Sequence, residues 1–120
     1  MPVFRLTDEL IFPDPRLATA EGLLAVGGDL SLQRLVLAYR FGIFPWYGEE
    51  EPILWWSPDP SSVLLPKDVY VSRRLERVIK QERFHLTCNR AFDQVIEACA
   101  NVRVNKGEET WLITEMQAAY

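Results

Sequence analysis

The sequence has few of the side chains that cross-link small proteins or bind metals. Its 120 residues include two cysteines, Cys88 and Cys99, and one histidine, His85. Two cysteines cannot form the several bridges of a disulfide miniprotein, and in a chain without secretory features they are more often free, buried thiols. A single histidine suggests neither a zinc site nor a Cys–His catalytic pair, so we expect no metal. We expect His85 to face outward from a strand-like run at 84–88.

Long apolar runs and glycine-rich nucleotide loops are also missing. No apolar run approaches the roughly 20 residues of a membrane helix, and the first ten residues, MPVFRLTDEL, do not resemble a signal peptide. We therefore expect a cytoplasmic protein with no membrane partner. Gly27-Gly28 belongs to neither G-x-G-x-x-G nor G-x-x-x-x-G-K-[ST], and no glycine-rich acetyl-CoA loop is present. A tight turn before the next helix explains the glycine pair.

The charge is unevenly distributed along an otherwise ordinary globular composition. Thirteen basic and 17 acidic residues give a net charge of −4, which argues against a general coat for DNA or other nucleic acid. Residues 1–60 hold nine acidic and four basic residues, whereas residues 61–120 hold eight and nine. Between residues 67 and 90 there are seven basic and three acidic residues. An anionic partner should therefore contact the second half.

Short strands and helices follow one another, which predicts an α+β fold. Strand-like runs lie at 3–6, 23–26, 53–56, 62–65 and 84–88. Ser31 and Gly42 bound the clearest helix, and further helices are expected after Ser72 and Asn89. Thr114 and Gln117 fit a capping box that opens a last helix.

The run Ser57-Pro58-Asp59-Pro60 allows no helix and predicts a rigid link. We therefore expect a small N-terminal domain over residues 1–60 and a second unit over residues 61–120. A lone carboxylate between two prolines is a poor acid–base candidate, and capping of nearby backbone N–H groups is the preferred interpretation of Asp59.

The helix after Ser72 carries a row of cations. At about 100° per residue, Arg73, Arg77 and Lys80 fall within a narrow sector. The opposite face is apolar and is expected to pack; it consists of Leu75, Val78 and Ile79. Such a row can follow a phosphate backbone without reading sequence, but a solvated helix face has the same pattern, and the spacing alone favours the solvated face.

Aromatic residues gather in loops and in one strand. Trp46 lies on a turn bounded by proline and glycine, and Trp111 lies just before the last expected helix. Rings on loops can stack on a nucleobase for roughly 1–3 kcal/mol each, or they can be part of the core, and the sequence leaves both readings open. Trp55 and Trp56 are expected on opposite faces of one strand, with at least one of them in the core.

Several blocks in this order resemble the bacterial leucyl/phenylalanyl-tRNA–protein transferases. The most specific are Gly27-Gly28-Asp29-Leu30-Ser31, Gly42-Ile43-Phe44-Pro45-Trp46 and Trp55-Trp56-Ser57-Pro58-Asp59-Pro60, supported by residues 89–100 and 110–114. The resemblance covers essentially the whole chain. It implies that residues 61–120 begin an acetyltransferase-like (GNAT-like) domain that uses no coenzyme A and no other cofactor.

The resemblance also implies an activity. Members of this family move Leu or Phe from aminoacyl-tRNA to the N-terminal Arg or Lys of a protein, which marks that protein for degradation by the N-end rule. The partners implied are therefore Leu-tRNA or Phe-tRNA and proteins with N-terminal Arg or Lys. Attack of a neutral amine on an ester needs orientation, a deprotonated amine and stabilisation of the oxyanion.

Individual residues acquire roles from the same resemblance. Trp46 and Trp111 match the tryptophans that hold the terminal adenosine of the tRNA, and Tyr39 and Tyr120 match tyrosines near the aminoacyl end. Three cations match positions that meet the tRNA backbone; these are Arg73, Arg77 and Lys80. For Tyr39, a place on the apolar stripe of its helix remains the competing interpretation. Ser61 stands where the family usually has Arg.

The length of the chain is the main departure from the family, whose members are about twice as long. Together with a capped helix that has barely begun at Tyr120, this predicts an N-terminal half. We expect the catalytic Asp and Gln and most of the Leu/Phe side-chain pocket to follow Tyr120, and we assign no catalytic residue within the chain. The alternatives are a truncated tRNA-binding module without catalysis and, disfavoured by the missing glycine-rich loop, a coenzyme-A acetyltransferase.

Overall fold

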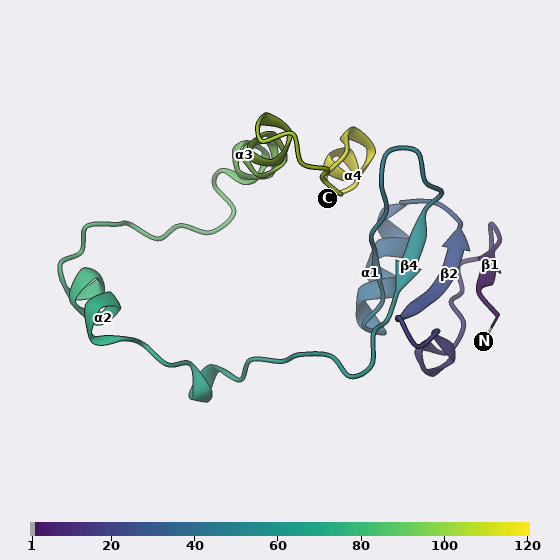
Figure 1. Ribbon diagram of the computed structural model, residues 1–120, viewed down its shortest axis with the longest axis horizontal. Helices are drawn as coiled ribbons and strands as arrows, with labels where there is room; N and C mark the ends of the chain where they lie inside the picture. The colour runs from purple at the N-terminus through teal and green to yellow at the C-terminus, as the bar shows by residue number, and fades with distance from the viewer. Residues whose placement is uncertain (1) are drawn as a thin grey trace.

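The computed structural model describes residues 2–120 and has an α+β architecture (Figure 1). The described residues form four strands, β1 (Phe4–Leu6), β2 (Leu23–Gly27), β3 (Phe44–Pro45) and β4 (Leu54–Trp56). They also form four α-helices, α1 (Leu32–Arg40), α2 (Arg73–Lys80), α3 (Phe92–Asn105) and α4 (Thr114–Ala119). Two short 3-10 turns, Pro15–Leu17 and Pro66–Asp68, complete the elements.

The four strands form one mixed sheet in the order β1-β2-β4-β3. β1 runs parallel to β2, whereas β4 is antiparallel to both β2 and β3. Trp55 is opposite Ala25 on one side and Pro45 on the other. Its side chain is fully buried, its ring meets Phe12 edge-on at 4.9 Å, and its Nε1 donates to the Gly27 carbonyl at 2.9 Å. The expectation that one residue of the Trp55–Trp56 pair belongs to the core is confirmed.

Helix α1 begins and ends where the sequence predicts. The Ser31 hydroxyl accepts from the backbone N–H of Arg34 at the N-terminus, and Gly42 adopts φ +69° just after the C-terminus. Leu35 and Ala38 are buried against the sheet. The apolar stripe of this helix consists of Leu32, Leu35, Val36 and Tyr39. Only Leu35 enters the core, because the other three side chains remain exposed.

A buried arginine takes part in the packing of α1. The guanidinium of Arg34 pairs with Asp29 at 3.2 Å and donates to the Thr7 carbonyl at 2.9 Å. Gly28 lies against it with φ +75°, and a Cβ there would come within 3.2 Å of the Arg34 Nε. At Gly28, the close approach of Arg34 therefore favours glycine in addition to the turn.

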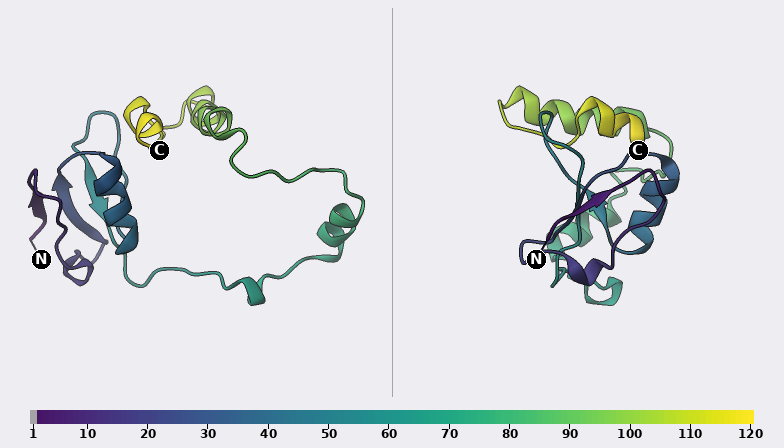
Figure 2. Two further views of the ribbon diagram at one scale, coloured as in Figure 1. Left: turned by 180° about the vertical axis from the view of Figure 1, so that it is seen from behind. Right: turned by 90° about the vertical axis from the view of Figure 1, so that its right-hand side faces the viewer.

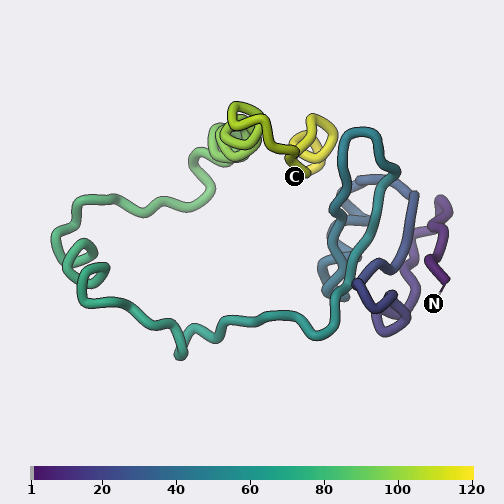
Figure 3. Tube along the Cα trace, viewed as in Figure 1, coloured from purple at the N-terminus to yellow at the C-terminus, as the bar shows by residue number. Residues whose placement is uncertain are grey.

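After the sheet the chain leaves the compact unit in a wide open arm, residues 58–91, which carries α2 (Figure 3). The radius of gyration is 17.8 Å, compared with about 14 Å for a compact chain of this length. The strands expected at 62–65 and 84–88 are wrong, because neither run has a neighbouring strand among the described residues. Leu64 and Leu86 are strongly exposed, and His85 is exposed as expected.

Helix α2 begins at the predicted cap but does not pack. The Ser72 hydroxyl accepts from the backbone N–H of Leu75. The prediction that the apolar face of this helix packs is wrong, because Leu75 and Ile79 are about half exposed. The extended arm holds α2 away from the sheet, so no described segment covers that face (Figures 1 and 2).

The remaining two helices differ from prediction at their starts. Asn89 does not cap α3, because the helix begins at Phe92 and Asn89 has a left-handed φ of +57°. The Thr114 capping box is also absent, since Ile113 is the N-cap residue and Gln117 donates to the Leu112 carbonyl instead.

Three other expectations concern the second half of the chain. Both cysteines, Cys88 and Cys99, are free as expected but exposed rather than buried, because no described segment covers α3 at Cys99 or the arm at Cys88. No helix within residues 2–120 has the length and apolar character needed to cross a bilayer. The boundary at residue 60 and the acetyltransferase-like character of residues 61–120 stay predictions.

Candidate functional site

Four aromatic side chains from distant segments meet where the chain returns to its N-terminal unit. Trp46 and Trp111 are stacked with ring centroids 5.8 Å apart and an angle of 28° between their planes. Tyr120 meets Trp111 edge-on at 6.0 Å and Tyr39 edge-on at 6.1 Å, and the two tyrosine hydroxyls are hydrogen-bonded. We call these four residues the aromatic cluster.

The backbone of Trp46 is fixed on both sides while its ring stays accessible. Its N–H donates to the Leu54 carbonyl at 3.0 Å, and its carbonyl accepts from Trp56 Nε1 at 2.7 Å. The preceding Pro45 is fully buried, yet the Trp46 side chain is 55% exposed. A well-ordered turn therefore presents a large aromatic face to solvent, as a stacking platform for a base requires.

Helix α4 brings Trp111 and Tyr120 to this turn. Met116 is fully buried, and Ala119 packs against the core cluster of the sheet and α1. The Tyr47 hydroxyl donates to a Glu115 carboxylate oxygen at 3.0 Å. Since Tyr47 is buried next to Trp46 in sequence, this bond links the start of α4 to the turn that carries the exposed tryptophan.

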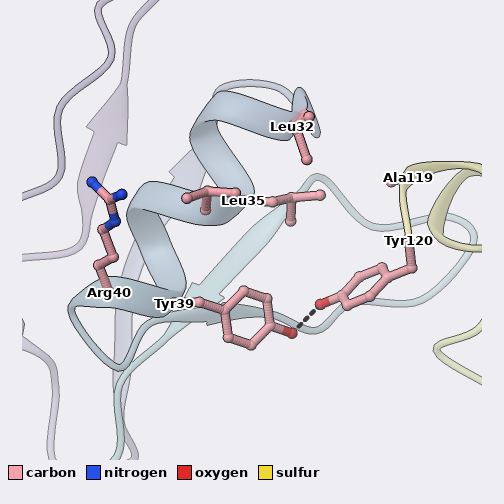
Figure 4. Close-up of a pocket in the computed structure, with 7 residues that line it drawn as sticks. Leu32, Leu35, Tyr39, Arg40, Ala119 and Tyr120 are labelled. Carbon is pink, nitrogen blue, oxygen red and sulfur yellow. Dashed lines mark hydrogen bonds between the residues drawn. The ribbon is translucent and has the colours of Figure 1, made fainter. Parts of the chain in front are cut away.

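The return of α4 also forms a cavity of about 490 Å³ beside α1 that is open to solvent (Figure 4). Its lining residues come from α1 and from the end of the chain: Leu32, Leu35, Val36, Tyr39, Arg40, Ala119 and Tyr120. The whole apolar stripe of α1 lines this cavity, and one of its members, Leu35, is also part of the core. Tyr39 and Tyr120, whose hydroxyls are hydrogen-bonded to each other, both line the cavity (Figure 4).

The buried Tyr47 and the partly exposed Tyr120 both have a raised pKa. Burial, and then the bond to Glu115, raises the pKa of Tyr47 to about 12. Burial, and then the bond to Tyr39, raises the pKa of Tyr120. Neither phenol supplies a base near neutral pH. The aromatic cluster is therefore suited to binding and orientation rather than to proton abstraction.

The spacing of the two tryptophans limits how a base can enter. Carbon atoms in contact are about 3.5 Å apart, so a ring held between two others needs them about 7 Å apart. At 5.8 Å the Trp46 and Trp111 rings are too close for that. A base can enter between them only if the two rings separate.

The cations of α2 do not join the aromatic cluster. Arg73, Arg77 and Lys80 are exposed, and Lys80 pairs with Glu76 at 2.8 Å. Figures 1 and 2 place α2 at the far side of the open arm, away from α1 and α4. Among residues 2–120, no group of three His, Cys, Asp or Glu side chains could hold a metal ion.

Comparisons with known proteins agree with the resemblance across both halves of the chain. The model of the leucyl/phenylalanyl-tRNA protein transferase N-terminal domain matches residues 28–59, and the model of leucyl/phenylalanyl-tRNA protein transferase matches residues 63–120. The chain belongs to this family.

The similar curated proteins are named leucyl/phenylalanyl-tRNA–protein transferases. One from Syntrophobacter fumaroxidans is 58% identical over all 120 residues, and one from Desulfatibacillum aliphaticivorans is 54% identical over the same length. The matches cover 51% and 52% of these relatives. The chain thus spans about half the length of the curated relatives it matches.

Sequence reasoning missed the polar pair that links α4 to the turn. Tyr47 and Glu115 are 68 residues apart, and nothing in their spacing predicts that they meet. The aromatic composition of residues 44–47 signals a special turn, but it does not distinguish the accessible Trp46 from the buried Tyr47.

The Tyr47–Glu115 bond gives a pH-dependent prediction. The pKa of Tyr47 is raised to about 12. The stability that the Tyr47–Glu115 bond contributes is therefore complete below pH 10 and is lost as pH rises through about 12. Tyr47→Phe should lower the free energy of unfolding by about 1 kcal/mol at pH 8. In urea denaturation, the difference between the wild type and this variant should shrink between pH 10 and 12.

The exposed Tyr70 supplies a matched control, since it is 84% exposed. Tyr70→Phe should leave the unfolding curve unchanged at every pH. Equal stabilities of the wild type and Tyr47→Phe at pH 8 would show that the bond to Glu115 does not hold α4.

Proposed function

We propose that this chain is the tRNA-binding half of an aminoacyltransferase that moves Leu or Phe from aminoacyl-tRNA to a protein with an N-terminal Arg or Lys, and so marks that protein for degradation. The convergence of Tyr39, Trp46, Trp111 and Tyr120 is the observation that carries the proposal. These are the positions at which the family resemblance expects the aminoacyl-adenosine end of the tRNA. The proposed place of action is the cytoplasm, where charged tRNA is used.

The proposed reaction makes one bond and breaks another at the ester of the charged tRNA. The neutral α-amine of the acceptor attacks the ester carbonyl carbon, a C–N bond forms, and the C–O bond to the terminal ribose breaks. The amine proton leaves, and the ribose oxygen gains a proton. The aromatic cluster contributes orientation, because fixed placement of two reactants removes much of the entropic barrier.

Each residue of the cluster has a separate proposed part in binding. Trp46 and Trp111 stack on the terminal adenine, with the exposed face of Trp46 as the first contact. Tyr120 lies one ring beyond Trp111 and Tyr39 lies one ring beyond Tyr120, and their hydroxyls hold the aminoacyl end. The side chain of the transferred residue is directed toward the apolar cavity beside α1.

The second part of the proposed interface is helix α2. Its exposed cations Arg73, Arg77 and Lys80 would follow the phosphate backbone of the acceptor arm. Figure 1 shows α2 across the open arm from α1 and α4, so a ligand that contacts both α2 and the aromatic cluster must be long, as an acceptor arm is. A tRNA-binding module that does no chemistry uses the same two surfaces and is the competing function.

A transfer assay tests the proposal with a full-length enzyme that contains this chain. The enzyme should move Leu from Leu-tRNA to a peptide with N-terminal Arg. Trp46→Ala and Trp111→Ala should each raise KM for Leu-tRNA about 5- to 150-fold, because a stacked base is worth about 1–3 kcal/mol. Trp46→Phe keeps an aromatic face and should retain most of the affinity.

Two results would contradict the proposal. Absence of transfer with Leu-tRNA and Phe-tRNA, while tRNA still binds, would favour the binding module. An unchanged KM in both alanine variants would remove the aromatic cluster from the tRNA site.

The role of α2 has its own test in the salt dependence of tRNA binding. Replacing Arg73, Arg77 and Lys80 by Ala should weaken binding and reduce the slope of log K against log salt concentration by about 2 to 3. A control triple variant, with Arg5, Arg16 and Arg103 replaced by Ala, removes the same charge from exposed positions elsewhere. Equal slopes for the two triple variants would assign the effect to net charge and reject the helix as a contact.

A further inference from the structure

A second, smaller pocket adjoins the aromatic cluster through Trp46. It has a volume of about 270 Å³ and is lined by Glu21, Phe44, Trp46, Trp56 and Pro58. Three aromatic rings and a single carboxylate thus surround one space. We call it the carboxylate–aromatic pocket.

The sheet builds this pocket from neighbouring strands. Phe44 on β3 is opposite Trp56 on β4, and the bond from Trp56 Nε1 to the Trp46 carbonyl at 2.7 Å fixes the indole of Trp56 beside the turn. Since Trp55 points into the core, the adjacent Trp56 faces the other side of the sheet.

A glycine brings the carboxylate to the aromatic rings. Gly22 has φ +93°, its carbonyl accepts from the Ser57 N–H at 2.7 Å, and a Cβ at this position would lie 2.8 Å from the Pro58 Cα. Only a residue without a side chain permits this approach. The turn that contains Glu21 is therefore held against Pro58 and the end of β4.

The pocket has the chemistry of a cation site. Hydrogen bonds from its own backbone N–H and from the Thr19 hydroxyl lower the pKa of Glu21, so its carboxylate is charged at neutral pH. No Lys or Arg side chain within residues 2–120 forms an ion pair with it. Aromatic faces attract guanidinium and ammonium groups, and tryptophan does so most strongly. The carboxylate disfavours an anionic occupant such as a phosphate.

The size and the surroundings of the pocket further limit the kind of group that can occupy it. A volume of 270 Å³ lies below the range of about 300–1,000 Å³ for whole small-molecule ligands, so one side chain is a better match than a free metabolite. The first 60 residues carry a net charge of −5, from nine acidic and four basic residues. This field draws cations toward the N-terminal unit.

We infer that the carboxylate–aromatic pocket holds the cationic side chain of the acceptor's N-terminal residue, with Glu21 as the charge partner and Trp46 and Trp56 as the aromatic walls. The inference rests on the proposed transfer function. Trp46 belongs to both the pocket and the aromatic cluster, so the acceptor side chain and the terminal adenosine lie against the same indole.

Kinetics of the full-length enzyme with matched peptides test the inference. Glu21→Gln should raise KM for a peptide with N-terminal Arg about three- to fivefold, the loss expected for one partly exposed charge pair. The values of kcat and of KM for Leu-tRNA should stay unchanged. With N-terminal citrulline, a neutral group of the same shape, wild type and Glu21→Gln should have equal KM. Glu9→Gln removes an equal charge at another exposed position and should behave as the wild type.

Two separate outcomes distinguish the pocket from the function on which it rests. If the wild type transfers Leu but Glu21→Gln has the wild-type KM for the Arg peptide, the pocket assignment is overturned and the transfer function stands. If the wild type transfers nothing, the proposed function fails. Titration of tryptophan fluorescence with the Arg peptide then tests the pocket assignment separately. Weaker binding of the peptide by Glu21→Gln than by the wild type supports the assignment, and equal binding overturns it.

Discussion

The adjacent tryptophans of β4 are the constraint on which the rest of the N-terminal unit depends. Successive residues of a strand point to opposite faces, so Trp55 enters the core while Trp56 faces the pocket side. Each indole N–H donates to a backbone carbonyl, that of Gly27 for Trp55 and that of Trp46 for Trp56. One dipeptide thus ties the middle of the sheet to the turn that presents the exposed tryptophan. Burial of a full indole makes this arrangement costly to disturb.

The second half of the chain contributes to the site only through its last residues. Helix α4 returns to the sheet with Met116 buried and Glu115 bound to Tyr47, and this return brings Trp111 and Tyr120 to Trp46 and Tyr39. The arm between the two halves follows a wide path, and its apolar side chains stay exposed. A long, charged ligand can contact both surfaces, with stacking on the aromatic cluster and cations on α2.

Local signals predicted two of the four helix caps, those at Ser31 and Ser72, but not those of α3 and α4. Ser31 and Gly42 bounded α1 correctly, and Ser72 capped α2. Prediction failed where an element needs a neighbour, since the runs at 62–65 and 84–88 have strand composition but no partner strand among the described residues. Asn89 failed as a cap because its own backbone is left-handed. Pattern analysis describes a segment in isolation, whereas a strand exists only as part of a pair.

The candidate site was likewise only partly predictable from the sequence. The family resemblance selected the four members of the aromatic cluster, although residue types and spacing alone left Trp46 and Trp111 undecided between core and surface. The structure brings all four together, but it leaves Arg73, Arg77 and Lys80 apart from them. Glu21 carried no signal in the sequence, because its importance comes from the approach of Gly22 to Pro58.

The indole N–H resonances of the four tryptophans test the central claim most directly. A non-hydrolysable amide analogue of leucyl-adenosine should shift the signals of Trp46 and Trp111 in an amide correlation NMR spectrum. The signal of Trp55, buried and bonded to Gly27, should stay in place as an internal reference. A titration that moves neither Trp46 nor Trp111, or that moves Trp55 as much as they move, would contradict the claim that the aromatic cluster receives the end of the tRNA.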